Sequence, residues 1–575
     1  MLELGTADDG PVVLSDDERA RHIHIIGSTG TGKSKLMEHM LRSDITKGRG
    51  LCLIDPHGTL AGQIAAWCAA RGLASVRKIH LVRPGDATWV AGFNPLRMGS
   101  GEAVSVRVDA MVAACAQVWG GQDMNQTPRL KKILRAVFYA LAVRKLTLAE
   151  ALALLSAADS AGARRALTRD LPDPVFAAIW VELNALTRRE FSEVAESAIN
   201  RMAEFLSAPA VRLMIGQDGS TLDFRSIMDA GDIVIVDLGA RGAISYENAR
   251  LVGALIINDL FLSALGRDER TAKCRPFTLY IDEAYDFLSG DVERILDQAR
   301  KFGLHAVLAH QRIGQLKERG EGVFNAVMGN THTKIVFGGL SDDDAEVMAR
   351  EILRSEVDLE RPKSSLDKPV VVEEVPVWLS SESESEGGGE ASGRSSSRAW
   401  ASSTGTSQGG ADVFRIVEGE QPEQIGQSVT AGLASAQSQG GNQSTTEARS
   451  SSWSRTQGRS QTLKPVRVWL PTTTHSLEEE LHFARVRLRE LPNRVAIVKR
   501  RGLPSVRMET PEVRPPLSSP AMAARFQERV STQSKYLSRV EGAEAALAAR
   551  LAERLALPAP ETAEPESWFE PVEDV

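Results

Sequence analysis

Short apolar runs alternate with amphipathic stretches over the first hundred residues. The segments 22–26 (HIHII), 51–55 (LCLID) and 78–82 (KIHLV) are short and mainly apolar, as expected of buried strands in a parallel sheet. After the first of them a glycine-rich break leads into KSKLMEHMLRSDI, where apolar residues recur at helical spacing. The order strand, loop, helix, strand is typical of an α/β fold. Two short strands around the turn Asp9-Gly10 precede this unit.

The strand pattern stops near residue 101 and returns after residue 216. Between residues 101 and 215 Ala and Leu dominate, and VSVRVDAMVAACAQVW and LKKILRAVFYALAV have helical periodicity. Strand patterns then recur at 232–238 (DIVIVDL), 277–284 (FTLYIDEA), 305–311 (HAVLAHQ) and 333–340 (TKIVFGGL). We therefore predict an α/β domain whose two parts, 1–100 and 216–379, are separated by an inserted all-helical domain.

A segment rich in Ser, Gly, Gln and Thr follows at residues 380–463. Such a composition buries too little apolar surface to offset chain entropy, so we predict a disordered insert. Order is expected to resume at 464–512, where the strand patterns at 466–471 (VRVWLP) and 493–499 (NRVAIVK) would complete the core. Residues 513–575 are expected to form one helix, from about 520 to 555, and an acidic tail.

Composition narrows the class of protein. The chain has 575 residues, which favours two to four domains. Its four cysteines form no CxxC pair, which argues against a zinc site of the usual spacing and against a disulfide-stapled secreted scaffold. The longest apolar stretch, 251–265, contains Asn258 and Asp259 and is too short and polar to span a bilayer. No signal peptide is visible, so we expect a cytoplasmic protein.

The net charge of −7 at first argues against a surface that binds nucleic acid throughout. The acidic residues, however, are concentrated in two places. Residues 380–390 contain four Glu and residues 558–575 contain six acidic side chains, with no Lys or Arg in either segment. The remainder of the chain is mildly basic, and neither requires nor excludes a nucleic-acid partner.

One segment after the first buried strand matches GxxxxGK[ST] in full and opens a predicted helix, which is the setting that a phosphate-binding loop requires. Its residues are Gly27, Ser28, Thr29, Gly30, Thr31, Gly32, Lys33 and Ser34. The glycines let backbone N–H groups point at phosphate oxygens, and the helix offers its positive end. Lys33 is expected to reach the β- and γ-phosphates of ATP and Ser34 to bind Mg²⁺. The alternatives are a chance glycine-rich turn and a dinucleotide-binding GxGxxG loop, in which the Lys-Ser pair would have no purpose.

Two adjacent carboxylates end the apolar run 277–281. Buried charges at a strand end are costly unless they serve a site. Asp282 is expected to hold Mg²⁺ through water, and Glu283 to polarise the water that attacks ATP. The alternative is a strand that simply exits into solvent. Asp237, at the end of another strand, is a rival, but no second acid follows it.

The distance between the two motifs separates families of phosphate-loop enzymes. Asp282 follows Lys33 by about 250 residues, more than a compact AAA+ or kinase-like domain needs. The ABC-type LSGGQ signature and the NKxD motif of GTPases are absent. A whole helical domain must therefore lie between the motifs, in agreement with the periodicity.

Several segments then match one family in its order. They are HIHIIGSTGTGKS, LCLIDPHG, GFNPL, FTLYIDEAYDFL, ILDQARKFGLHAVLAHQRIGQL and GNTHTKIVFG. The chain resembles the HerA/FtsK-type motor ATPases, most closely the conjugative type IV coupling proteins of the TraG/TraD kind, over about residues 1–350. This resemblance implies an α/β fold with a RecA-like P-loop NTPase core, ATP and Mg²⁺ as cofactors, and a ring, hexameric in the family, that passes DNA through its pore.

The resemblance also implies roles for single residues. Gln311 is similar to the family's glutamine that senses the γ-phosphate, and Arg300 is similar to the arginine finger that enters the neighbouring subunit's site. Asp55 and His57 follow the second strand, where His57 more readily structures the loop than carries a proton. Membrane-bound members carry a transmembrane region before the phosphate loop, whereas only 26 residues precede Gly27 here. We therefore expect any recruitment to a membrane to come through a partner.

Two basic clusters are candidates for contact with DNA, by neutralising phosphates. The first lies on a predicted helix of the inserted domain and contains Arg129, Lys131, Lys132 and Arg135. The second is the run of Lys499, Arg500 and Arg501 near the C-terminal part of the core. For each cluster, a merely solvated basic face is an equally good interpretation.

The sequence leaves three functions open. The first is an ATP-driven DNA translocase of the conjugative coupling type, with a relaxase or a membrane secretion channel as possible partner. The second is a HerA-like translocase that works with a nuclease in DNA repair or phage defence. The third is a secretion-machine ATPase that acts on protein.

Overall fold

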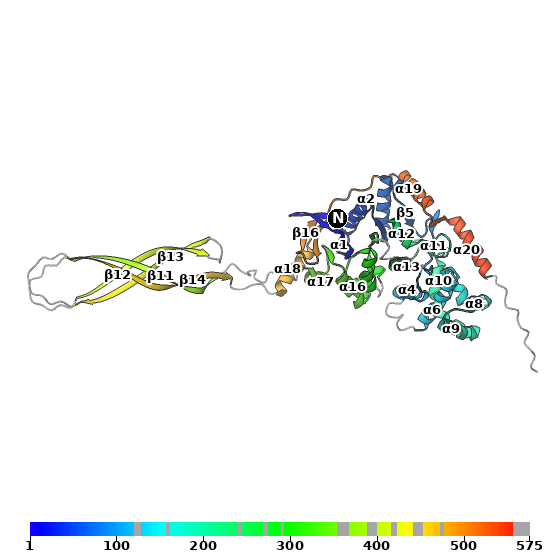
Figure 1. Ribbon diagram of the computed structural model, residues 1–575, viewed down its shortest axis with the longest axis horizontal. Coiled ribbons are helices and arrows are strands. Elements are labelled where there is room, and N and C mark those ends of the chain that lie inside the picture. The colour runs from blue at the N-terminus through cyan, green and yellow to red at the C-terminus, as the bar shows by residue number, and fades with distance from the viewer. Residues whose placement is uncertain are drawn as a thin grey trace, which may run out of the picture. The chain divides into compact units, whose positions relative to one another are not determined.

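The computed structural model describes the chain in two units (Figure 1). The described residues are 1–99, 101–119, 128–156, 161–239, 243–267, 274–288, 292–352, 367–387, 399–415, 423–440, 452–471 and 477–555. The first unit comprises Met1–Arg361 and His475–Val575, and the second comprises Pro362–Thr474. The acidic tail predicted at 558–575 lies outside the described residues.

A single mixed sheet forms the centre of the first unit. Its order is β2 (Gly10–Leu14), β1 (Leu2–Ala7), β16 (Val506–Glu509), β15 (Val495–Arg500), β10 (Thr333–Phe337), β3 (Ile23–Ile26), β9 (Leu304–His310), β8 (Phe277–Ile281), β4 (Gly50–Asp55), β7 (Ile233–Asp237) and β5 (Ile79–Val82). The pairs from β10 to β5 are parallel, whereas β15, β16, β1 and β2 extend the sheet in antiparallel pairs. The predicted α/β fold is confirmed.

Helices cover both faces of this sheet. Neighbouring residues of a strand point to opposite sides, and here the residues on both sides are mainly apolar and pack against helices. Ile23 and Ile25 pack into the apolar cluster that contains α2 and α3, whereas Ile26 packs on the other side. One face carries α2 (Lys33–Thr46), α3 (Thr59–Ala70) and α19 (Pro520–Gln533). The other carries α12 (Phe224–Ala230), α13 (Tyr246–Leu265), α14 (Val292–Ala299), α15 (Ile313–Glu318), α16 (Glu321–Asn330), α17 (Asp342–Ile352) and α18 (Leu477–Arg489).

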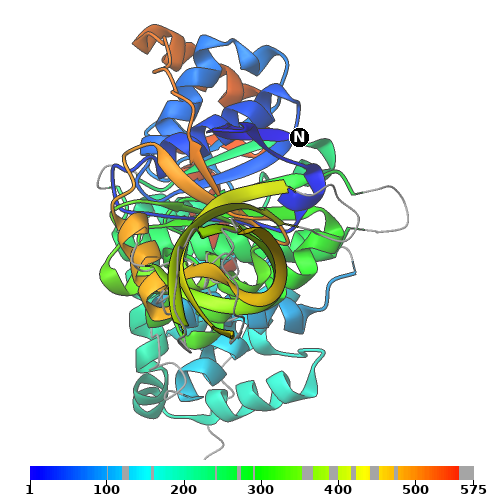
Figure 2. The ribbon, with the colours of Figure 1, turned by 90° about the vertical axis from the view of Figure 1, so that its left-hand side faces the viewer.

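The described residues from 104 to 215 form helices without strands, within the range predicted for an inserted helical domain. They are α4 (Val104–Trp119), α6 (Pro128–Val143), α7 (Ala151–Leu155), α8 (Ala161–Thr168), α9 (Pro174–Ala185), α10 (Arg188–Ser207) and α11 (Pro209–Ile215). These helices gather at one end of the first unit (Figure 2). Local signals set the boundaries: Thr187 and Glu190 form a capping box that starts α10.

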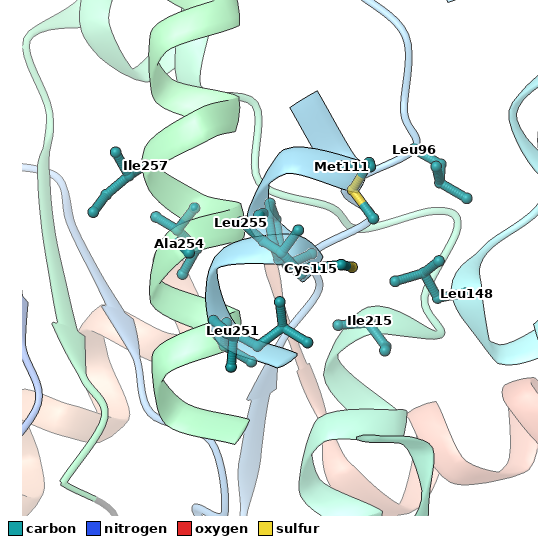
Figure 3. Packing of buried hydrophobic residues seen from close by; sticks show 14 of the residues in the cluster. Leu96, Met111, Cys115, Leu148, Ile215, Leu251, Ala254, Leu255 and Ile257 are labelled. Atoms are coloured by element: carbon teal, nitrogen blue, oxygen red, sulfur yellow. The ribbon is translucent and has the colours of Figure 1, made fainter. Parts of the chain in front are cut away.

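The helical domain is joined to the core through α4 and α13. Figure 3 shows Met111 and Cys115 of α4 beside Leu251 and Leu255 of α13, in one continuous apolar cluster. By length and composition α13 could cross a membrane, but 78% of its apolar window is buried inside the protein. Asp259, which interrupts its apolar sequence, pairs with the buried Arg107 of α4. Asp259 therefore links α13 of the core to α4 of the helical domain.

The C-terminal residues form two helices instead of the single helix predicted from about 520 to 555. Between α19 and α20 (Val540–Leu555) the strand β17 (Leu537–Arg539) pairs with β6 (Trp89–Ala91). This tertiary pairing overrides the helical pattern of the sequence. Further on, Arg550 of α20 donates to Glu150 at 3.0 Å and lies 3.1 Å from Asp218, so α20 fastens onto the helical domain.

The second unit also differs from the prediction of a disordered insert at 380–463. Its described residues form two antiparallel pairs, β11 (Asp367–Gly387) with β14 (Ser452–Pro471) and β12 (Ala399–Arg415) with β13 (Glu423–Gly440). The prediction rested on weak side-chain hydrophobicity, whereas the backbone groups here satisfy one another along the paired strands. The strand expected at 466–471 is part of β14 and pairs with β11, so it does not complete the core sheet; a period-two pattern cannot identify the partner strand.

Candidate nucleotide-binding site

Three neighbouring strands of the sheet bring the predicted site residues together. β3, β9 and β8 are adjacent and parallel, so their C-terminal ends lie at one edge. The phosphate-binding loop follows β3, Gln311 follows β9, and Asp282 and Glu283 follow β8. Ligands of open α/β sheets bind at this carboxyl edge.

The loop itself has the geometry of an anion cradle. Gly30 and Gly32 have φ values of 82° and 123°, which side chains with a Cβ rarely adopt. A Cβ on Gly27 would come within 2.5 Å of the Cβ of Phe337 on β10, so the loop packs directly on the neighbouring strand. α2 begins at Lys33, and none of the described side chains caps it, which leaves its first N–H groups to an anion.

Lys33 lies inside this loop. Its Nζ donates to the backbone oxygens of Gly27 at 2.6 Å and Ser28 at 3.1 Å. The residue is 5% exposed. Burial lowers the pKa of its ammonium group, while the negative charges of Glu283 and Asp282 oppose that shift. The lysine thus lies between the loop and the two acids, whereas Ser34 is exposed on the first turn of α2.

The two acids are buried, and one of them is strained. Asp282 and Glu283 are 7% and 5% exposed. Burial raises the pKa of Asp282 to about 6, with further contributions from Asp55 and Glu283. Glu283 has φ 48° and ψ 53°, a left-handed conformation that is costly for a residue with a Cβ, and no described residue donates to its Oε2. Buried, strained carboxylates mark a site that is kept for chemistry at the expense of stability.

Gln311 connects the loop to these acids. Its Nε2 donates to Oε1 of Glu283 at 2.6 Å, and its Oε1 accepts from the hydroxyl of Thr29 at 3.0 Å. The side chain therefore spans the space between the phosphate-binding loop and the carboxylate. The Gln311 side chain can therefore contact a ligand that lies between the phosphate-binding loop and the carboxylate of Glu283.

The remaining acids near the site have backbone partners. Asp55 accepts from the N–H groups of His57 and Ala61, both at 2.9 Å, and so shapes the turn into α3. Asp237, the rival at the end of β7, accepts from Arg83 at 3.0 Å and from the N–H of Gly239 at 3.2 Å. Both carboxylates hold chain turns in place.

A segment that was not predicted from the sequence closes the loop from the other side. Ser28 N–H donates to the carbonyl of Gly338 at 3.2 Å, and Arg494 N–H donates to the carbonyl of Thr31 at 2.8 Å. Arg494 has φ 68°, again in the left-handed region. The Gly338-Gly339 pair after a strand was a signal for a close approach, whereas nothing local indicates that Arg494 reaches the loop.

Asp286 was also missed. It is 1% exposed and accepts from the Tyr246 hydroxyl at 2.5 Å, and Arg250 lies 3.4 Å from the same oxygen. Burial raises its pKa, and Tyr246 and Arg250 lower it. These contacts fasten the segment after Glu283 to α13.

Arg300 lies away from this site. It belongs to a turn of 3₁₀ helix, Arg300–Phe302, that precedes β9, whereas Gln311 follows the end of β9. A seven-residue strand spans about 23 Å. The guanidinium is 44% exposed and lies 3.5 Å from Asp17, a weak surface pair. Arg300 therefore does not contact the phosphate-binding loop of its own chain.

The first basic cluster, on α6, is largely engaged in ion pairs. Lys132 pairs with Glu182 and Arg135 with Asp109, both at 2.7 Å. Lys131 is partly buried, and Arg129 is exposed. This cluster is less basic than the sequence suggests, because neighbouring helices supply acids.

The second cluster lies at the end of β15, beside the start of β10. Arg500 lies 3.7 Å from Glu18, Arg501 hydrogen-bonds with the His332 ring at 3.1 Å, and Lys499 is partly buried. The pKa of His332 is lowered by burial and by neighbouring cations that include Arg501 and Arg300. The second cluster and Arg300 thus share the edge of the sheet opposite the phosphate-binding loop.

The residues present fit a nucleotide with Mg²⁺. Within the described part of the chain, no group of three or more His, Cys, Asp or Glu side chains could hold a metal ion alone. A cation here would need phosphate oxygens in addition to the hydroxyl of Ser34 and the carboxylate of Asp282. A bound cation would favour the charged form of Asp282, which burial otherwise disfavours.

Two family models match the chain. The central domain of the helicase HerA matches residues 2–60, which include the phosphate-binding loop. The TraM recognition site of TraD and TraG matches residues 276–401, which include both acids, Arg300 and Gln311. The predicted resemblance to HerA/FtsK-type motors close to the coupling proteins is confirmed. A comparison with curated proteins gives no match.

Solved structures show distant similarity. A bacterial conjugative coupling protein in an unbound form is 16% identical, with 90% of each chain covered and a TM-score of 0.47. The plasmid coupling protein TrwB in complex with ADP and Mg²⁺ is 15% identical, with 91% of this chain and 92% of that chain covered and a TM-score of 0.47. VirB4 of Thermoanaerobacter pseudethanolicus is 15% identical, with 62% of this chain and 88% of that chain covered and a TM-score of 0.41.

Replacing Asp282 by Asn should stabilise the protein in the absence of nucleotide and Mg²⁺. The pKa of Asp282 is about 6 when folded and 3.8 as an ordinary carboxyl, so the folded state binds this proton more tightly. The free energy of unfolding of the natural protein should therefore fall as pH rises from about 4 to 6, and the deficit should persist at pH 7.5. Asp282→Asn should raise it there by about 1–3 kcal/mol.

Denaturant unfolding in EDTA at pH 4, 5.5 and 7.5 measures this effect. The gain from Asp282→Asn should shrink toward pH 4. Asp343→Asn, on the exposed first turn of α17, is the control and should give no gain at any pH, because a negative charge near a helix N-terminus is weakly stabilising. A loss of stability for Asp282→Asn at pH 7.5 would show that the carboxylate is not destabilising there.

Proposed function

We propose that this protein is an ATP-driven DNA translocase of the conjugative coupling type. The observation that carries the proposal is the position of Gln311, which bridges Thr29 of the phosphate-binding loop and Glu283. A side chain in this bridge can exchange one partner for another when the contents of the loop change. The match of the TraG/TraD model to residues 276–401 supports the coupling type.

In this proposal each residue of the site has one task. The N–H groups of the loop and Lys33 would hold the β- and γ-phosphates of ATP, and Ser34 and Asp282 would hold the Mg²⁺ that offsets the phosphate charge. Glu283 accepts a hydrogen bond from the water that attacks the γ-phosphate, since it is buried beside the lysine. Gln311 exchanges its contact with Thr29 for one with the γ-phosphate and so reports hydrolysis to β9.

Arg300 acts on a neighbouring subunit. Its place at the opposite edge of the sheet keeps it from its own site. Head-to-tail packing in a ring would allow that edge to face the next subunit's carboxyl edge. The weak pair with Asp17 holds the guanidinium without burying it. A hexamer, as in the family that the sequence resembles, is the expected ring.

DNA is the proposed substrate of the motor. Both basic clusters remain candidates, and Arg129 on α6 is exposed. The expected location is the cytoplasm, with a relaxase or a membrane secretion channel as partner.

A HerA-like translocase that works with a nuclease is the second candidate function. The match of the HerA central domain to residues 2–60 favours it. It shares the site and the motor with the first candidate and differs in the partner. Co-purification with a nuclease and without a relaxase would favour this second candidate.

Lys33→Ala and Glu283→Gln should each abolish ATP turnover. The first removes the charge that faces the phosphates, and the second removes the base, so kcat should fall by at least about 10²- to 10³-fold. Lys35→Ala is the matched control, because Lys35 lies on the same helix but is exposed and pairs with Glu38. Phosphate release measured at saturating ATP tests this prediction, and normal turnover in either active-site variant contradicts the assignment.

Arg300→Ala should bind nucleotide normally and lose turnover by about 10³-fold or more. Mixing it with Glu283→Gln subunits should restore activity, because some interfaces then combine an intact Arg300 with an intact Glu283. Lys301→Ala, at the adjacent exposed position, is the control. If no mixing ratio restores turnover, Arg300 does not act between subunits.

DNA should stimulate ATP turnover, and the stimulation should weaken as salt rises, because phosphate contacts release counterions. Turnover is measured with single- and double-stranded DNA at 50 and 200 mM salt. Between these two concentrations, a protein that contacts several phosphates loses about 10³- to 10⁵-fold in its affinity for DNA. Arg129→Ala should reduce the stimulation, and Arg189→Ala, which alters an exposed pair on α10, should leave it intact. Turnover that is indifferent to DNA would favour a motor that acts on protein.

A further inference from the structure

Two histidines lie directly beneath the nucleotide site and have no part in the chemistry described so far. His24 on β3 and His310 on β9 are 0% and 1% exposed. His24 pairs across the sheet with Leu308, so His310, two residues further on, faces the same side. Their Nε2 atoms form a hydrogen bond, and the two rings lie within 14° of parallel.

The positions of the protons follow from the partners of the rings. Nδ1 of His310 lies 3.0 Å from the carbonyl oxygen of Arg312, which can only accept, so this nitrogen carries a hydrogen. A neutral His310 then has a bare Nε2, and His24 must donate to it from its own Nε2. Nδ1 of His24 is left bare, and it has no hydrogen-bond partner among the described residues.

Burial keeps both rings neutral. It lowers the pKa of His310 to about 4 and that of His24 well below its ordinary value. Lys33 adds to the shift of His310, and Lys334 adds to that of His24. A proton added to Nε2 of His310 would place two N–H groups face to face, and one added to Nδ1 of His24 would have no acceptor among the described residues. For two neutral rings, only one arrangement of hydrogens satisfies the pair.

His310 brackets the backbone of Gln311. The bond from the His310 ring to the carbonyl of Arg312 spans the residue between them, and therefore fixes the two peptide groups that flank Gln311. The other end of the chain of hydrogen bonds is His24, three residues before Gly27 on the strand that carries the phosphate-binding loop. The backbone of Gln311 is thus tied to the same strand that its side chain reaches through Thr29.

We propose that His24 and His310 form a proton-ordered clamp that positions Gln311 between the phosphate-binding loop and Glu283. Both are positioning residues, because they act through Gln311 and touch none of the reacting groups. The proposal rests on the proposed ATPase function. It adds an explanation of how Gln311, the proposed γ-phosphate sensor, is held between Thr29 and Glu283. An apolar pair would fill the same space with no unpaired nitrogen, so packing alone does not account for two histidines here.

His24→Phe is the decisive variant, because it keeps a buried ring but removes the donor to His310. His310 then keeps its bond to Arg312 but loses its link to β3, so its ring, and with it Gln311, is free to shift. A misplacement of this kind should lower kcat by about 10- to 100-fold, with the KM for ATP changed by less than about twofold. His24→Gln retains an N–H donor and should recover most of kcat.

His305→Phe is the matched control. His305 is also a buried histidine of β9, but it lies near the opposite end of the strand from Gln311. It should leave kcat and KM unchanged even if it lowers stability as much as His24→Phe does. Steady-state ATP hydrolysis of the full-length variants, with thermal unfolding measured in parallel, provides the comparison.

The proton order has its own signature. In ¹⁵N spectra of the histidine-labelled protein, assigned with the Gln variants at positions 24 and 310, His310 should carry its hydrogen on Nδ1 and His24 on Nε2. This measurement does not depend on turnover. If the natural protein hydrolyses no ATP, the proposed function fails while the spectra still decide whether the clamp exists.

Three results would overturn the proposal. They are a kcat for His24→Phe within about twofold of the natural protein, equal losses in the Phe and Gln variants at position 24, and the same tautomer in both rings. If His24→Phe does not fold, the kinetics of His24→Gln and the tautomers of the natural protein remain decisive: a slow Gln variant or a matched pair of tautomers excludes the clamp.

Discussion

The parallel pairing of β3, β9 and β8 is the constraint on which the site depends. Because these strands run in the same direction and are neighbours, the residues that follow them meet at one edge of the sheet. Gln311 follows the middle strand and can therefore reach Thr29 on one side and Glu283 on the other. A strand order that separated any of the three would break this bridge, whatever the side chains.

The site that results is not a stable arrangement in its own right. It holds two buried acids side by side, a lysine whose charge burial disfavours, and a strained Glu283. Such features persist only where the surrounding structure determines them. Here the apolar faces of the sheet, the close packing of Gly27 on Phe337 and the contacts of Asp286 supply that support.

What the sequence predicted well was local. A glycine at 27, 30 and 32 and an apolar strand before two acids are patterns of a few neighbouring residues, and their strands and loop lie where expected. What it missed depends on contacts between distant residues. The break between α19 and α20 exists because Leu537–Arg539 pairs with Trp89–Ala91, and the strand 466–471 pairs with β11 instead of the core. The residue pattern of a segment indicates that it is a strand, but it does not indicate which distant strand it pairs with.

The hydrogen bond from Arg494 to Thr31 has a consequence for how the chain is made. Ribosomes release the phosphate-binding loop early, but its last backbone partner emerges when most of the chain has been synthesised. The sheet has the same property, since β1 pairs with β16. A chain truncated before Arg494 would hold a loop without its final contact, so incomplete products are poorly suited to hydrolyse ATP. The high sequence separation of these contacts also makes slow folding the expected behaviour.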